Sequence, residues 1–154
     1  TMNFSKLDGL LNRIKALGQK EIYVGVIAKT APRKDQKARF SNAQIAAVHE
    51  FGAPNKGIPA RPFLRSTLIR NKQVYTDALA TQLRKAVRQK QSPEQAYQQV
   101  GFKAAQDVQH EIRHGSHAPL KATTIQRKKS SQPLIDIGQL HQSITSIVRE
   151  VNES

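Results

Sequence analysis

The chain has 154 residues, and its 25 Lys and Arg outnumber 11 Asp and Glu, giving a net charge of +14. It has no cysteine, which excludes disulfides and thiolate metal sites. No apolar run approaches the length of a membrane span and no secretory signal pattern appears, so we expect a soluble product made in a cytoplasm, with no membrane partner. The length predicts one domain over residues 1–154. The charge predicts an anionic partner such as DNA, or a place in an assembly beside one.

The first forty residues predict a helix, a strand and a loop. Apolar residues recur at three- and four-residue steps within 1–20, which predicts an amphipathic helix ended by Gly18. The segment EIYVGVIA at 21–28 predicts a buried strand. The basic segment 29–41 has no periodicity and predicts a flexible loop. Its candidate contacts to DNA or a partner are Lys29, Arg33, Lys34, Lys37 and Arg39.

The middle of the chain predicts a short helix and then a long helical pair over 62–114. Ser41 or Asn42 caps the short helix, and Gly52 ends it. One long helix is predicted from Phe63 to about Lys90. Ser92-Pro93-Glu94-Gln95 reads as a capping box that starts the second, which stops at Gly115. Its apolar stripe is Ala96, Val100, Ala104, Val108 and Ile112.

Residues 118–150 predict a C-terminal motif followed by a strand. Asp136 and Gln139 fit a further capping box, and ITSIVREV has the composition of a strand. Together the elements predict an α+β fold. We expect a small antiparallel or mixed sheet packed against two long α-helices, with the N-terminal helix covering an edge or a face of the sheet.

The stretch HEIRHGSH at 110–117 fits the zinc-hydrolase pattern H-E-x-x-H. Such a site needs a third protein ligand and an open position on the metal. Its weak candidate ligands are His110, His114 and His117. The alternative is that these imidazoles complement the dipole at a helix C-terminus. We favour that interpretation, and we expect no resident metal, no cofactor and no catalytic residue.

Other patterns for chemistry are weak. His49 and Glu50 are adjacent on a helix and do not face each other, which disfavours an acid–base pair. No Gly-rich phosphate loop occurs, and only 5% of residues are aromatic, which disfavours a base-stacking platform. Backbone contact with DNA, a solvated basic surface, and pairing with acids on neighbouring subunits all stay open as uses of the charge.

Two longer stretches are distinctive: NAQIAAVHEFGAPNKGIPARPFLRSTL at 42–68 and APLKATTIQRKKSSQPLIDIGQLHQSITSIV at 118–148. With IYVGVIA, they resemble the neck or tail-completion proteins of tailed bacteriophages and prophages, over about residues 20–148. The first stretch resembles the family motif at His49, Glu50, Phe51, Gly52, Pro59, Arg61, Pro62, Phe63 and Arg65. The second resembles it at Pro119, Leu120, Thr124, Lys128, Asp136, Gly138, Leu140 and Ser143; Ile137 stands where the family often has Thr.

This resemblance implies a non-enzymatic virion assembly protein at the head–tail junction. Its implied partners are copies of itself in a ring, commonly a hexamer, other neck, connector or tail-tube proteins, and DNA passing through the lumen. The motif residues make sense as structure. Pro59 and Pro62 suppress helix and direct Phe63 into the core. If the long helix began at Arg61, Arg61 and Arg65 would lie one turn apart and could grip a carboxylate.

Overall fold

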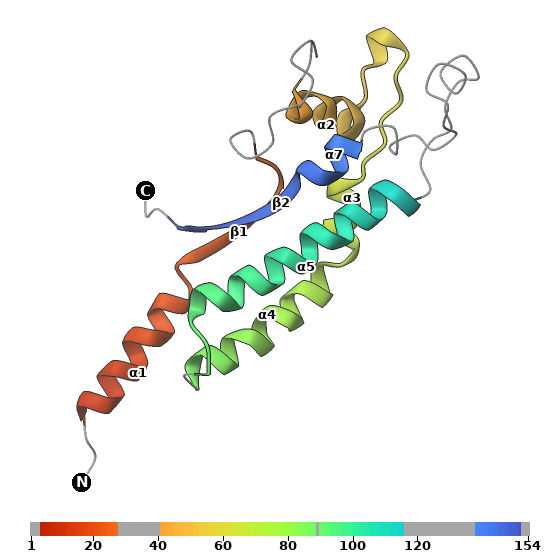
Figure 1. Ribbon diagram of the computed structural model, residues 1–154. Helices are drawn as coiled ribbons and strands as arrows, with labels where there is room; N and C mark the ends of the chain where they lie inside the picture. Colours follow the sequence, from red (N-terminus) through yellow and green to blue (C-terminus); the bar gives the residue numbers. More distant parts are fainter. Residues whose placement is uncertain (1–3, 28–40, 89, 116–137, 152–154) are drawn as a thin grey trace. The chain divides into compact units, whose positions relative to one another are not determined.

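The structure of the protein is a computed structural model that describes residues 4–27, 41–88, 90–115 and 138–151 (Figure 1). Over these residues it has the predicted α+β fold, mostly helical with a two-stranded antiparallel sheet. The chain divides into two compact units. Of the described residues, the first unit holds 4–24, 72–88, 90–104 and 146–151, and the second holds 25–27, 41–71, 105–115 and 138–145.

The first unit contains helices α1 (Phe4–Leu17) and α4 (Lys72–Val87), the beginning of α5 (Pro93–His114), and most of strands β1 (Lys20–Val26) and β2 (Ile144–Glu150). β1 and β2 pair with each other (Figure 1), and the Val151 N–H donates to the Gln19 carbonyl at 2.8 Å beside them. A Cβ on Gly101 of α5 would lie 3.0 Å from Ile22 Cγ2 of β1. The helix therefore packs closely on the sheet, as the sequence predicted.

Two expectations about the first unit were wrong in detail. β1 was predicted to be buried, but none of its residues is fully buried, and Tyr23 is 49% exposed. A two-stranded sheet covered by helices on one face leaves the other face to solvent. The N-terminal helix was expected to cover the sheet, yet the main contact of α1 is with α4.

The apolar stripe predicted for α5 is confirmed residue by residue. All five of its members are at most 4% exposed: Ala96, Val100, Ala104, Val108 and Ile112. The capping box at the start of α5 is also confirmed. Gln95 N–H donates to Ser92 Oγ at 3.1 Å, and Ser92 N–H donates to Gln95 Oε1 at 3.0 Å.

The second unit contains α2 (Asn42–Phe51), the short 3-10 turn η1 (Pro54–Lys56), α3 (Leu64–Arg70), the end of α5, and α7 (Gly138–Ser143). Ser41 and Gln44 form a capping box at the start of α2, with Gln44 N–H 3.2 Å from Ser41 Oγ. The most buried apolar side chains of this unit are Phe63, Val108, Ile112 and Leu140. The unit also buries five polar or charged residues: Asn42, Glu50, Arg61, Thr67 and Ser143. None of the helices in the described part of the chain has the length and apolar content to span a bilayer.

The single long helix predicted from Phe63 to Lys90 was wrong, because two helices, α3 and α4, meet at Asn71. Asn71 leaves the helical region at φ −98° and ψ 9°. Its side-chain amide and its backbone N–H each lie 3.1 Å from the Thr67 carbonyl oxygen. Asparagine competes for backbone hydrogen bonds in this way, which is why it favours helix ends over helix interiors.

Candidate functional site

The first stretch of the resemblance folds into a corner in which α2 and α3 are joined by one carboxylate. We call His49–Arg65 the α2–α3 corner. Glu50 is 5% exposed at the end of α2. Its Oε2 accepts from Leu64 N–H and its Oε1 from Arg65 N–H, both at 3.0 Å. Phe63, the residue at the α3 N-cap, has no side-chain cap, so Glu50 satisfies two of the free N–H groups there. A carboxylate at a helix N-terminus also complements the helix dipole.

Gly52 ends α2 in a conformation that only glycine readily adopts. Its φ is 74° with ψ −179°, and its N–H donates to the Val48 carbonyl at 2.8 Å. The prediction that Gly52 ends the helix is confirmed, although ψ is extended rather than left-handed helical. A Cβ here would lie 2.7 Å from Ala60 N and 2.9 Å from Ile58 O. The returning chain therefore occupies the space that any other side chain would need.

The segment from Ala53 to Pro62 forms a tight loop that leads the chain back to the end of α2. Ala53 and Ile58 form an antiparallel bridge around η1, and Arg61 N–H donates to the His49 carbonyl at 2.6 Å. Arg61 is 5% exposed, and burial lowers the pKa of its guanidinium. Because α3 begins at Leu64, the helix register needed for Arg61 and Arg65 to share a carboxylate is absent. The expected burial of Phe63 is confirmed, since its side chain is fully buried.

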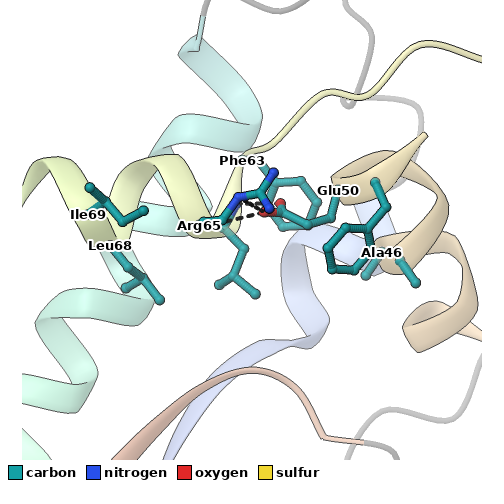
Figure 2. Close-up of a pocket in the computed structure, with 9 residues that line it drawn as sticks. Ala46, Glu50, Phe63, Arg65, Leu68 and Ile69 are labelled. Carbon is teal, nitrogen blue, oxygen red and sulfur yellow. Dashed lines mark hydrogen bonds and ion pairs between the residues drawn. The ribbon is translucent and has the colours of Figure 1, made fainter.

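An apolar groove of about 440 Å³ lies between α2 and α3 beside this corner. Figure 2 shows Glu50 and Phe63 at the groove with Arg65 reaching across it. The guanidinium carbon of Arg65 stands 5.8 Å from the Phe51 ring centre, and Arg65 Nε is 3.9 Å from Glu50 Oε1. The residues that line the groove are Ala46, Ala47, Glu50, Phe51, Phe63, Leu64, Arg65, Leu68 and Ile69.

The described part of the second stretch packs against the first through contact between α7 and α2. Leu140 is fully buried, and the buried Ser143 hydroxyl donates to the Leu140 carbonyl at 2.7 Å. Gly138 is exposed at the start of α7. Burial, followed by the nearby charge of Arg113, lowers the pKa of His141. The remaining predicted residues of this stretch lie outside the described residues: Pro119, Leu120, Thr124, Lys128 and Asp136.

Two of the three candidate zinc ligands lie side by side at the end of α5. The rings of His110 and His114 are 4.5 Å apart and exposed to solvent. Glu111, between them in sequence, accepts a hydrogen bond from Arg70 Nη2 at 2.6 Å. His117 lies outside the described residues, and within the described ones no group of three potential ligands gathers. Stoichiometric zinc in the full chain would support the zinc-hydrolase alternative, and its absence would exclude it.

The sequence did not predict the ion pairs and hydrogen bonds between residues far apart in the chain. Lys20 Nζ forms ion pairs with Glu94, at 3.1 Å, and with Glu150, and the Tyr97 hydroxyl donates to the Leu17 carbonyl. Hydrogen bonds from Glu150 and Glu94 raise the pKa of Lys20, and burial raises that of Tyr97. No local pattern marks partners this far apart in sequence. The basic contact candidates of segment 29–41 lie outside the described residues.

No family model, curated protein or solved structure matches this chain.

Proposed function

We propose that this chain is a structural, non-enzymatic assembly protein of a tailed bacteriophage or prophage, of the neck or tail-completion type. The two stretches that resemble that family supply the first support. They lie about fifty residues apart in sequence, and their helices α2 and α7 pack against each other. Apart from 146–148, the described residues of these two stretches therefore lie in one structural unit.

The observation that carries the proposal is how the residues of the first motif are used. Both carboxylate oxygens of Glu50 hold backbone N–H groups, and Gly52 sits where the returning chain leaves no room for a side chain. Arg61 and Phe63 are buried. Each of these residues fixes backbone geometry or fills the core. A motif used in this way favours a rigid scaffold for protein contacts over a reactive site.

In the proposed role, copies join as a ring at the head–tail junction and contact neck, connector or tail-tube proteins. A closed ring of identical subunits uses two different, complementary surfaces on each copy. A net charge of +14 suits a subunit that lines or borders a channel for DNA, because phosphate contacts need no sequence recognition. The proposed location is the virion, after assembly in the host bacterial cytoplasm.

Electron microscopy of particles made without this protein tests the proposal. We expect unjoined heads and tails, with joining restored when the wild-type chain is supplied from a plasmid. A Gly52→Val chain should fail to restore joining, whereas Gly9→Ala, an exposed helix position with nothing within 4 Å of its added Cβ, should restore it. Normal infectious particles in the absence of the protein would exclude the proposal.

A sequence-independent DNA-binding protein is the second candidate, favoured by the charge alone. It predicts duplex binding at low salt whose logarithmic affinity falls steeply and linearly with the logarithm of salt concentration. Two duplexes of unrelated sequence should bind equally well. The absence of a mobility shift at about 50 mM salt would remove this candidate.

A further inference from the structure

The groove between α2 and α3 is apolar at its base and at its rim. Phe51 and Ile69 are 66% and 67% exposed, far more than large apolar side chains buried within a core. Leu64 and Leu68 extend the same apolar lining from α3. Single exposed apolar residues are ordinary, but a hollow with apolar walls and an apolar rim marks a surface that binds something.

A second uncovered apolar surface lies on α1. Leu7, Leu11 and Ile14 are 43%, 47% and 48% exposed, although they belong to the apolar stripe of an amphipathic helix. Their spacing of four and three residues places them on one face. Leu10 and Leu17 are less exposed, and α1 contacts α4. The helix thus has more apolar surface than its own unit covers.

The chain therefore carries both halves of a helix-in-groove contact. Amphipathic helices bind grooves by inserting side chains at positions i, i+4 and i+7, the spacing of Leu7, Leu11 and Ile14. Each surface also offers one charge of opposite sign, although the other charged residues of α1, Lys6, Arg13 and Lys15, are basic. Asp8, the sole acidic residue of α1, lies about 60° from Leu11 around the helix and borders the stripe. Arg65 stands at the groove with a side chain that is 58% exposed.

We propose that the apolar face of α1 in one copy inserts into the α2–α3 groove of a second copy of this chain, with Asp8 beside Arg65. The contact joins two different surfaces, so it propagates from copy to copy and closes if the rotation allows. This inference rests on the proposed assembly function, because it names the surfaces through which the copies join.

Disulfide trapping tests the contact, because the chain has no cysteine of its own. Full-length Leu11→Cys protein is mixed with Ile69→Cys protein that carries a mass tag, and the mixture is oxidised. A disulfide requires Cα atoms within about 7 Å of each other. We expect the mixed dimer to form at least five-fold above a control pair of Leu11→Cys with Phe102→Cys. Phe102 is equally accessible, at 63% exposed, and lies on α5. A yield no higher than that of the control would overturn the proposal.

A single chain carrying both Leu11→Cys and Ile69→Cys distinguishes contacts between copies from contacts within one. Disulfide-linked dimers and larger species support the proposal. A disulfide-closed monomer, formed independently of protein concentration, overturns it in favour of α1 folding onto its own chain. Binding of α1 to anionic lipid vesicles that Leu11→Glu abolishes, without trapping, overturns it in favour of a membrane surface.

Solution mass separates this proposal from the function it rests on. Leu11→Glu should lower the average mass in sedimentation, while Phe102→Glu should leave it at the wild-type value. If trapping fails but the wild type still associates, the copies join elsewhere and the assembly function survives. If trapping succeeds but particles lacking the protein are normal, the contact stands and the phage function is wrong.

Discussion

The α2–α3 corner and helix α5 are stabilised in opposite ways. α5 buries a stripe of apolar side chains along its length, and its stability comes from removing apolar area from water. The corner depends on a few positions, chiefly the backbone of Gly52 and the two oxygens of Glu50. Apolar packing tolerates exchange between side chains of similar volume, whereas a backbone conformation or a hydrogen-bond acceptor has few substitutes. The difference between the two regions can be measured.

Gly52→Ala should be the most damaging small change. It adds one methyl group, but it places a Cβ 2.7 Å from Ala60 N at a positive φ. Backbone strain and displacement of the returning chain together should lower the free energy of unfolding by about 3–5 kcal/mol. Urea denaturation followed by circular dichroism measures this. Gly9→Ala is the control, and it should raise stability by about 0.5–1 kcal/mol, because it removes a flexible residue from a helix. Equal changes in unfolding free energy for Gly52→Ala and Gly9→Ala would contradict the interpretation that the backbone at position 52 requires glycine.

In contrast to Gly52, Ile112 of α5 should tolerate a substitution that preserves side-chain volume. Ile112→Ala removes most of a side chain that is 2% exposed, and we expect a loss of about 2–5 kcal/mol from lost burial and the cavity left behind. Ile112→Leu preserves the volume and should cost less than about 1.5 kcal/mol. Phe102→Ala, on the exposed side of the same helix, should stay within about 0.5 kcal/mol of the wild type. The three unfolding midpoints give the test. If Ile112→Leu proved as damaging as Ile112→Ala, the two regions would not differ as argued.

Glu50→Gln tests the carboxylate that joins the two helices of the corner. The amide keeps one acceptor oxygen but presents an NH₂ group to the second backbone N–H, so one donor at the start of α3 loses its partner. An unsatisfied buried group costs about 1–3 kcal/mol, and we expect a loss in that range. Asp77→Asn makes the same chemical change on the exposed face of α4 and should be neutral to within about 0.5 kcal/mol. Hydrogen exchange should locate the effect of Glu50→Gln at the Leu64 and Arg65 amides.

The same contrast explains what the sequence could predict. The α5 stripe, the helix cap at Ser41, the capping box at Ser92 and the C-terminal strand depend on residues within a turn or two of each other. Such local patterns were confirmed. The sequence also identified Gly52 as the end of α2, because a glycine after an apolar periodic run is itself a local signal.

One error came where a distant partner decides the outcome. α3 begins at Leu64, and the carboxylate that satisfies the N–H groups of its first turn belongs to a residue fourteen positions earlier. The break at Asn71 is local. It was missed because the helical spacing of apolar residues in α3 continues into α4. The groove beside Phe51 could not be predicted either, since periodicity does not reveal which apolar residues are left uncovered.

We expect the smallest effect at Lys20, because its carboxylate partners are exposed, whereas Glu50 is buried. Glu94, in the first turn of α5, and Glu150 hydrogen-bond its ammonium group and raise its pKa above the usual 10.5. A pKa raised by folding means that the ion pairs stabilise the protein fully below about pH 10.5, and that this stabilisation is lost as pH rises through the folded-state pKa.

The unfolding free-energy difference between the wild type and Lys20→Met should therefore be constant between pH 8 and pH 9.5 and shrink toward pH 12. In a Glu94→Gln/Glu150→Gln background, Lys20→Met should produce no such pH-dependent difference. If the difference in unfolding free energy between the wild type and Lys20→Met persisted at pH 12, Lys20 would act through the packing of its methylene chain instead of its charge.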